Sequence, residues 1–164
     1  MALNFRPATP ADIAACVDLR GKTRENAIPA IRLPAMGITV ASWSKDVETG
    51  ALPGFVCTDG ETIVGYCFGE VASGEVVVLA LLPNYESQGI GRRLLGLVVQ
   101  QLGAAGHKRL FLSCSADPKT RSYGFYRHMG WSSTGTIDRF NDEVLEFFPP
   151  AIENSSHRAA ASEA

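Results

Sequence analysis

The sequence predicts an α+β domain: one mixed, mostly antiparallel sheet flanked by helices. Three apolar, β-branched segments follow one another with short polar breaks between them: residues 54–58, 62–71 and 75–83. The breaks contain Asp59-Gly60 and Ser73-Gly74, which are tight hairpin signals, so we expect three antiparallel strands. The segment 75–114 then has a strand–helix–strand pattern, which predicts a parallel crossover. A mixed sheet follows from these observations.

The N-terminal part predicts one strand and two helices. Residues 3–9 alternate in polarity, which indicates a first strand. Thr9 can cap a helix and Pro10 suits its first position. Residues 27–39 contain two prolines and a glycine, so we expect a broken helical segment or a loop there. A second helix is expected to begin at Ser42 or Ser44 and to end at Gly50.

The C-terminal part begins with the longest helix, residues 89–105. It has an apolar face at helical spacing, made by Ile90, Leu94, Leu95, Val98 and Leu102, and Gly106 ends it. Residues 108–114 predict a strand. Asp117 is the expected cap of a short helix that starts at Pro118 and stops at Gly130. Residues 131–137 and 142–148 predict a closing hairpin. We therefore expect one domain over residues 1–148 and a disordered tail over 149–164.

Composition excludes several classes of protein. The chain has 164 residues, 46% of them apolar, and a net charge of −2, so no basic excess indicates nucleic acid or a membrane surface. The first residues lack a basic region followed by an apolar core, so we expect a cytoplasmic protein. Four scattered cysteines are expected to be reduced and buried: Cys16, Cys57, Cys67 and Cys114. No spacing of cysteine and histidine resembles a metal site, and no metal is expected.

The stretch NYESQGIGRRLL, residues 84–95, carries the functional signal. Gly89 and Gly91 stand where a strand gives way to a helix, and glycine lets the backbone pass close to a bulky group. The first N–H groups of a helix lack partners within it and favour an anion. Arg92 and Arg93 in the same first turn oppose the helix dipole unless an anion is present. An anionic ligand, favourably a phosphate, is therefore expected at this turn.

Three classes of phosphate-containing ligand could bind at such a turn: a nucleotide, a dinucleotide and coenzyme A. A nucleotide P-loop needs Gly-Lys-Ser/Thr at the helix start, whereas Gly91 is followed by two arginines. A dinucleotide fingerprint needs a third glycine where Leu94 stands, and it follows a doubly wound sheet rather than hairpins. Coenzyme A is the third ligand. Here the sequence resembles the GNAT superfamily of acyl-CoA N-acyltransferases, whose signature is Gln/Arg-x-x-Gly-x-Gly/Ala between a strand and a helix.

The resemblance spans about residues 3–148 and has two parts. In the first, Glu86-x-x-Gly89-x-Gly91 matches the glycines and departs at the first position, where Gln88 and Arg92 could substitute as donors. The second part is YGFYRHMGW, residues 123–131, which is similar to the family's aromatic-Tyr…Gly-aromatic segment. The resemblance implies a GNAT-like fold and acetyl-CoA as the donor of an acetyl group.

The resemblance also implies a cofactor site. The backbone of Leu79, Ala80 and Leu81 would pair with the pantetheine arm. The pyrophosphate would lie against the N-terminus of the helix, on a loop and first turn made of Ser87, Gln88, Gly89, Ile90, Gly91, Arg92 and Arg93. The family often has Asn-x-x-Ala ahead of its tyrosine, and this chain has Lys119 and Ser122 there. Asp117 or Lys119 could replace that contact.

Acetyl transfer needs a base and an acid. An amine with a pKa near 10.4 is mostly protonated at neutral pH, so a carboxylate must take its proton. By resemblance Glu75 is the first candidate for this base, with Glu70 the runner-up. Tyr126 falls where the family's acid tyrosine lies and would protonate the departing thiolate, with Tyr123 a weaker choice. Direct attack is preferred to an acyl-enzyme on Cys114.

The acceptor is the least specified part. Three arginines could hold a carboxylate, which favours a small metabolite or an amino acid as acceptor, with a protein amine as another class: Arg20, Arg24 and Arg32. We expect a monomer or a homodimer. The alternative function is a non-catalytic acyl-CoA-binding sensor or regulatory module that keeps the fold and the ligand without turnover.

Overall fold

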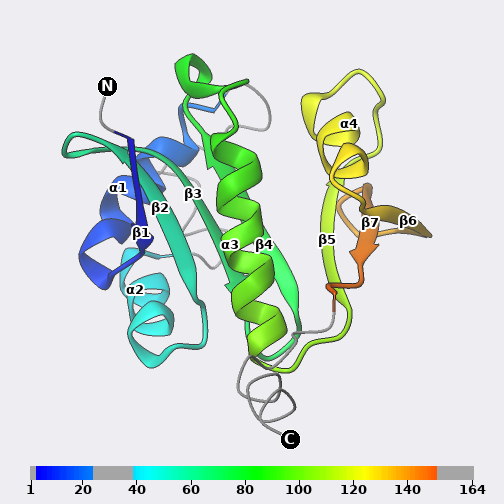
Figure 1. Cartoon of the computed structure of the whole chain (residues 1–164), viewed down its shortest axis with the longest axis horizontal. Coiled ribbons are helices and arrows are strands. Elements are labelled where there is room, and N and C mark those ends of the chain that lie inside the picture. Colours follow the sequence, from blue (N-terminus) through cyan, green and yellow to red (C-terminus); the bar gives the residue numbers. More distant parts are fainter. Residues whose placement is uncertain (1–2, 24–38, 151–164) are drawn as a thin grey trace, which may run out of the picture.

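A computed structural model describes residues 3–23 and 39–150 of the chain, and within these residues seven strands form one sheet (Figure 1). The strand order is β1-β2-β3-β4-β5-β7-β6. The strands are β1 Leu3–Pro7, β2 Gly54–Asp59, β3 Thr62–Glu70, β4 Glu75–Leu81, β5 Leu110–Ser115, β6 Ser132–Ile137 and β7 Asp142–Phe147. Neighbouring strands run antiparallel except β4 and β5, which run parallel. The predicted mixed sheet and its parallel crossover are confirmed.

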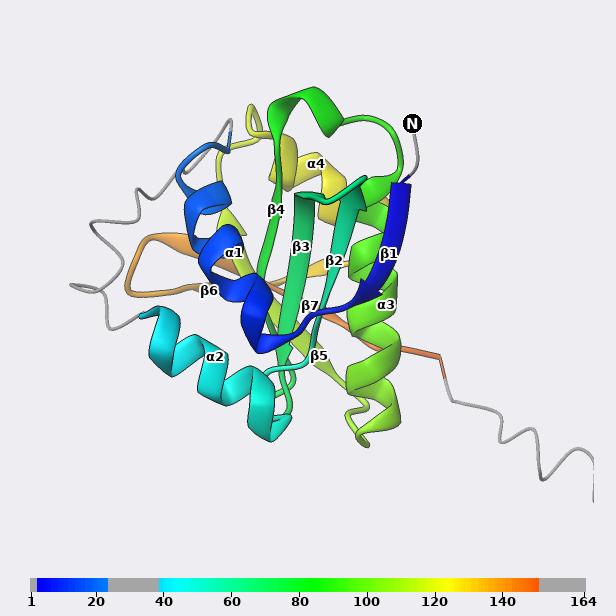
Figure 2. The same cartoon turned by 90° about the vertical axis from the view of Figure 1, so that its left-hand side faces the viewer.

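Helices cover both faces of the sheet. α1 Ile13–Arg20 and α2 Val40–Thr49 lie on one face, and α3 Ile90–Ala104 lies on the other (Figure 2). α4 Arg121–His128 follows β5. Two short 3₁₀ turns, Pro10–Asp12 and Pro83–Tyr85, precede α1 and follow β4. The sheet therefore separates two hydrophobic clusters.

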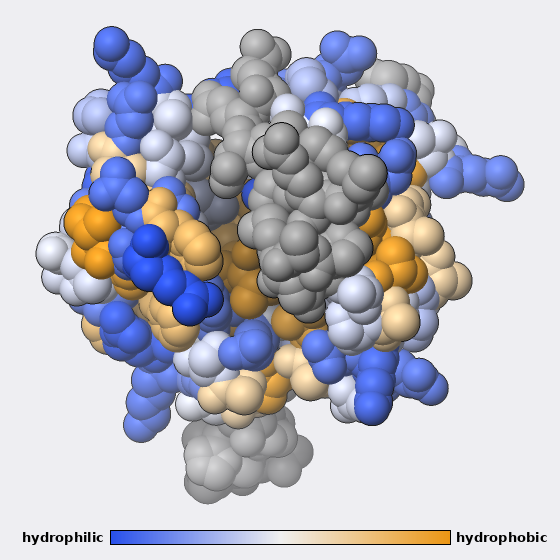
Figure 3. Space-filling model, turned by 180° about the vertical axis from the view of Figure 1, so that it is seen from behind, coloured by the Kyte–Doolittle hydropathy of each residue, from blue (hydrophilic) through white to orange (hydrophobic). Residues whose placement is uncertain are grey.

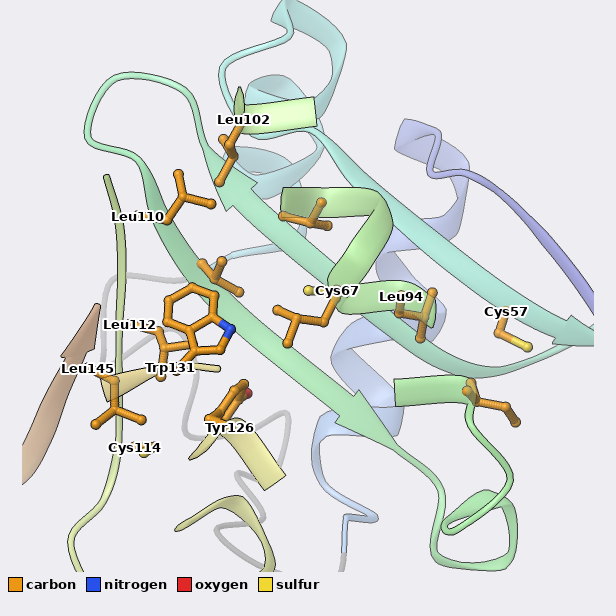
Figure 4. Close-up of a cluster of buried hydrophobic side chains, with 14 of the residues drawn as sticks. Cys57, Cys67, Leu94, Leu102, Leu110, Leu112, Cys114, Tyr126, Trp131 and Leu145 are labelled. Atoms are coloured by element: carbon orange, nitrogen blue, oxygen red, sulfur yellow. The ribbon is translucent and has the colours of Figure 1, made fainter. Parts of the chain in front are cut away.

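The larger cluster lies under α3 and α4 (Figure 4). The apolar face predicted for α3 is buried, with Ile90, Leu94, Leu95, Val98 and Leu102 each 2% exposed or less. A glycine in β3 leaves space for this face of the helix. A Cβ at Gly69 would lie 2.8 Å from Leu102 Cδ1, so only glycine lets the helix pack this closely on β3. This packing fixes the C-terminal half of α3 close to the sheet.

The smaller cluster joins α1 and α2 to the opposite face of β2, β3 and β4. Trp43 of α2 makes edge-on contacts with Phe68 at 5.1 Å and with Tyr66 at 5.8 Å between ring centroids. Figure 3 shows this side of the molecule, with apolar residues near its middle and others among the hydrophilic residues toward its left and right edges. The start of α1 is held by Asp12, whose carboxylate accepts from both terminal nitrogens of Arg6 at 2.7 and 2.8 Å and from the Thr9 N–H at 2.8 Å.

Two predicted helix starts were wrong. α2 begins at Val40 because Thr39, not Ser42 or Ser44, is its cap: the Thr39 hydroxyl accepts from the Ser42 N–H at 2.9 Å. α4 begins at Arg121, later than predicted, and Thr120 is its N-cap. The Asp117 carboxylate instead accepts from the Lys119 N–H at 2.9 Å, which closes a separate turn ahead of the helix.

Other predictions have mixed outcomes. Gly50, Gly106 and Gly130 end their helices with positive φ, as expected. The irregular segment predicted for residues 27–39 lies, except for Thr39, outside the described residues, and so do residues 151–164 of the predicted tail. All four cysteines are buried and free. Within the described residues, no group of side chains could hold a metal ion, and no helix is long and apolar enough to cross a membrane.

Candidate functional site

The sheet opens between its two parallel strands. Their register joins Glu75 of β4 to Phe111 of β5, at the beginning of both strands, and beyond this pair the strands diverge (Figure 1). Val77 is an extra residue in β4 because Phe68 faces Val78 while Gly69 faces Val76, and such a bulge bends a strand. A cavity of about 590 Å³ occupies the opening, lined by residues 76–81 of β4 and 112–115 of β5.

The N-terminus of α3 borders the same cavity. Gly89 caps the helix with φ 81°, a left-handed conformation that L side chains rarely adopt, and a Cβ there would meet no atom within 4 Å. A Cβ at Gly91 would lie 3.3 Å from Leu81 Cδ1 and 3.5 Å from Phe125 Cζ. Both glycines line the cavity, together with Ser87 and Arg92. The helix start is thus open to a bulky anion, which its free N–H groups favour.

The predicted cofactor residues divide into two groups. Seven of them line the cavity: Leu79, Ala80, Leu81, Ser87, Gly89, Gly91 and Arg92. Three of the others have side chains that are engaged elsewhere. Gln88 donates to the Asn84 carbonyl at 3.1 Å, Ile90 is buried in the core, and the Arg93 guanidinium lies 4.3 Å from the centre of the Phe5 ring.

Asp117 and Lys119 belong to the turn before α4 and are not among the residues that line the cavity. Thr120, Arg121 and Ser122 line it at this point instead. The reason is the late start of α4, which brings residues 120–122 to the mouth of the cavity and leaves the preceding turn outside it.

Tyr126 lies deep on the α4 side of the cavity. Its ring lies edge-on to those of Phe125 and Trp131, with centroid distances of 5.1 and 6.2 Å, and Figure 4 shows Tyr126 beside Trp131. Burial raises the pKa of its hydroxyl well above the ordinary value, and the nearby Cys67 and Cys114 thiols add to this. The hydroxyl therefore keeps its proton at neutral pH. Tyr123 is placed differently: its ring lies 3.6 Å from the Arg127 guanidinium, and it is not among the residues that line the cavity.

Glu75 stands at the narrow end of the opening and is half-buried, although it is not one of the residues that line the cavity. Burial raises the pKa of its carboxyl group, and the neighbouring carboxylates of Glu70 and Asp138 raise it further. Glu70 accepts a hydrogen bond from the Ser73 hydroxyl at 2.6 Å. Asp142 does line the cavity, and burial also raises its pKa. The narrow end is therefore acidic through Glu75, Glu70 and Asp138, whereas Asp142 pairs with Ser115 at the far end of β5.

Cys114 lines the cavity as a thiol rather than a thiolate. Burial raises its pKa to about 11, so little of it is ionised at neutral pH. A thiolate is the nucleophilic form. This supports direct attack over an acyl-cysteine.

Several lining residues were not singled out from the sequence as ligand contacts, among them Glu86, Ser113, Arg121 and Asp142. Only Arg121 carried a signal, because a cation in the first turn of a helix opposes the dipole. Asp142 reaches the cavity through the placement of β7 beside β5, which depends on tertiary structure. Of the arginines proposed for the acceptor, Arg20 lines the cavity, while Arg24 and Arg32 lie outside the described residues.

Solved structures share this fold. The PaiA N-acetyltransferase of Thermoplasma acidophilum, in complex with coenzyme A, has a TM-score of 0.69 at 15% identity, over 91% of this chain and all of that one. The putative acetyltransferase YncA of Salmonella typhimurium, with acetyl-CoA, has a TM-score of 0.68 at 14% identity, over 94% and 99%. The ribosomal-protein-S18-alanine N-acetyltransferase of Escherichia coli has a TM-score of 0.67 at 15% identity, over 93% and 97%. At these identities the likeness concerns the fold.

Sequence comparison places the chain in a family. A comparison with curated proteins finds no match. The model of the acetyltransferase (GNAT) family matches residues 22–131, about two thirds of the chain, including the glycine turn of α3 and all of α4. By that match the chain belongs to the GNAT family of acetyl-CoA-dependent N-acetyltransferases.

Proposed function

We propose that this protein transfers the acetyl group of acetyl-CoA to a primary amine by direct attack, with Glu75 as the base and Tyr126 as the acid. The observation that carries the proposal is the shared cavity: the glycine turn of α3 and the buried Tyr126 line one opening between β4 and β5. The proposed phosphate site and the proposed proton donor thus share one opening.

The shape of the cavity supports acetyl-CoA as the ligand. Gly89 and Gly91 leave room at the helix N-terminus that side chains would fill, and Arg92 adds a cation. From this turn, Leu81, Ala80 and Leu79 lead along the open edge of β4, where backbone groups can pair with the amides of an extended arm. A strand of seven residues is about 20 Å long, so an arm running along β4 has its far end directed towards Glu75. When bound, the cofactor supplies a thioester.

The base is supported by its environment. A general base works best with a pKa near the operating pH, and burial with neighbouring carboxylates raises the pKa of Glu75 in that direction. Glu75 would accept the proton of the acceptor amine, directly or through one water. Glu70 and Asp138, whose charges act on Glu75, would favour the approach of a positively charged amine before it loses its proton.

The acid is supported by its protonation state. Because burial keeps Tyr126 protonated, its hydroxyl can donate to the sulfur as the carbon–sulfur bond breaks. The departing thiolate, whose thiol has an ordinary pKa near 8.5, is a weaker base than a phenolate, so the hydroxyl would assist mainly through a hydrogen bond to the sulfur rather than by complete proton transfer. Tyr123 is held against Arg127 and is a poorer candidate.

A screen of amines tests the proposal and also identifies the acceptor. Thiol release from acetyl-CoA would be measured across small amines, amino acids and peptides with free N-termini or lysines. We expect turnover with a defined subset, and a small metabolite or an amino acid is favoured because Arg20 lines the cavity. Tight acetyl-CoA binding without turnover across the whole panel would instead support the sensor function.

A further inference from the structure

The two walls of the cavity are connected at its mouth by side chains of Glu86 and Arg121. Arg121 is the first residue of α4, and its Nε lies 3.4 Å from Oε2 of Glu86 in the loop before α3. Its Nη1 lies 3.4 Å from the Ser87 hydroxyl in the same loop. All three residues line the cavity. A guanidinium from the far wall therefore reaches the loop beside the glycine turn.

Among the described residues, the charges at this end of the cavity favour a second cation beside Arg92 for a pyrophosphate. Arg93 lies over Phe5 and does not line the cavity, so Arg92 is the cation that the first turn of α3 contributes to it. The carboxylate of Glu86, whose side chain is only 13% exposed, also lines the cavity and opposes an anion there. Arg121 restores a positive balance where an anion would bind, and guanidinium groups bind phosphate in a bidentate manner.

The contacts of Arg121 also differ from those of a comparable pair. Arg109 Nε lies 2.7 Å from Glu146 Oε2, the usual length of a charge-assisted hydrogen bond, with an arginine side chain 46% exposed. The Arg121 side chain is 50% exposed and both of its contacts to the loop are 0.7 Å longer. Surface pairs of this kind contribute about 0–1 kcal/mol. A phosphate can therefore replace the carboxylate at little cost.

We propose that Arg121 binds the pyrophosphate of the cofactor from the α4 side of the cavity, and that Glu86 holds its guanidinium at that place in the free protein. The inference rests on the proposed cofactor site. Arg121 is then a binding residue, and Glu86 is a positioning residue that acts through it. The cofactor is held between two helix starts, by Arg92 on α3 and by Arg121 on α4.

Calorimetry with four ligands tests the binding role. Coenzyme A and dephospho-coenzyme A both carry the pyrophosphate, phosphopantetheine carries one phosphate, and pantetheine carries none. We expect Arg121→Ala to weaken coenzyme A and dephospho-coenzyme A about equally, by about 10- to 100-fold, because a hydrogen bond to a charged group contributes about 1.5–3 kcal/mol. The loss should be smaller for phosphopantetheine and absent for pantetheine.

The matched control is Arg109→Ala, which removes the same charge from an arginine–glutamate pair outside the cavity. It should leave all four affinities unchanged. Two results would overturn the assignment of Arg121: an unchanged affinity of Arg121→Ala for coenzyme A, or a loss that disappears with dephospho-coenzyme A, which would place the guanidinium on the 3′-phosphate.

A double variant tests Glu86. In Arg121→Ala the Glu86 carboxylate faces the phosphates with no Arg121 guanidinium beside it, and it repels them. Arg121→Ala/Glu86→Gln should therefore bind coenzyme A several-fold more tightly than Arg121→Ala. Equal affinities would remove Glu86 from the proposal. Failure here is distinguishable from failure of the cofactor site itself: if the wild-type protein binds coenzyme A and Arg92→Ala weakens it while Arg121→Ala does not, the site stands and this inference falls.

Discussion

Glu75 and Phe111 face each other across β4 and β5, and the two strands diverge from this pair onward. The proposed base therefore stands where the sheet divides, next to the open edge of β4 along which the cofactor arm would lie. This placement explains why the carboxyl group is half-buried and close to other carboxylates. It also makes the role of Glu75 separable by experiment from that of Tyr126 on the opposite wall.

Tyr126→Phe should lower kcat by about 10²–10⁴-fold and leave the affinity for acetyl-CoA nearly unchanged, because the hydroxyl acts on the sulfur only as the bond breaks. Steady-state kinetics and calorimetry measure the two quantities. The control is Tyr123→Phe, since that ring packs against Arg127 and does not line the cavity. A kcat of Tyr126→Phe close to the wild-type value would remove Tyr126 from the mechanism.

Glu75→Gln should lower the rate near neutral pH and recover part of it at high pH, where the amine is already neutral. The wild-type rate should rise with pH through the raised pKa of Glu75. Glu70→Gln removes one of the charges that raise this pKa, so its acid limb should move to lower pH. The measurement is the pH profile of kcat/KM. An unshifted acid limb in Glu70→Gln, or a wild-type profile in Glu75→Gln, would contradict the assignment.

Glu75→Gln should also make the fold more stable at neutral pH. Because the folded-state pKa of Glu75 is raised, the folded protein binds its proton more tightly than the unfolded chain, and stability falls as pH rises above the unfolded value. Glu75→Gln removes this penalty at neutral pH and has none to remove below about pH 4. Thermal unfolding at the two pH values measures the difference; a neutral-pH Tm below that of the wild type would refute it.

Gly91→Val should reduce the affinity for coenzyme A by at least about 10-fold while the domain stays folded. The added Cβ already meets Leu81 and Phe125 at 3.3 and 3.5 Å, and the two further methyl groups would crowd the wall of the cavity. Gly96→Val is the matched control: Gly96 is an exposed position of the same helix with nothing within 4 Å of an added Cβ. If both variants bound coenzyme A alike, the glycine turn would not be the phosphate site.

Asp12→Asn should destabilise the fold at neutral pH by about 2 kcal/mol, and the difference should vanish in acid. The Arg6 guanidinium, together with the Thr9 N–H, lowers the pKa of Asp12 to about 2 against opposing desolvation. The stabilisation is therefore complete above the unfolded pKa near 3.8 and is lost as pH falls through about 2. Urea unfolding at several pH values measures it, and a difference that is independent of pH would show that the ion pair is not its cause.

Sequence by itself determined the elements whose signals are local. Hairpin turns at Asp59-Gly60 and Ser73-Gly74 ordered β2, β3 and β4, and the spacing of apolar residues after Gly89 defined α3 and its buried face. Such signals act within about four residues of one another, which is the reach of a turn or of one helical turn. Local rules gave a wrong helix start where two residues could act as the N-cap: Asp117 closes a separate turn, and α4 begins only at Arg121.

Only the tertiary structure decided which side chains meet at the cavity. Arg92 and Arg93 are adjacent in sequence, yet one lines the cavity and the other lies over Phe5, because successive residues of a helix point about 100° apart and the core fixes the rotation of α3. Glu86 and Arg121 are 35 positions apart and face each other only because β4 and β5 diverge between them. Asp142 reaches the cavity because β7 pairs with β5 rather than lying at the edge of the sheet. Long-range packing, which no local pattern encodes, therefore selects the residues of the site.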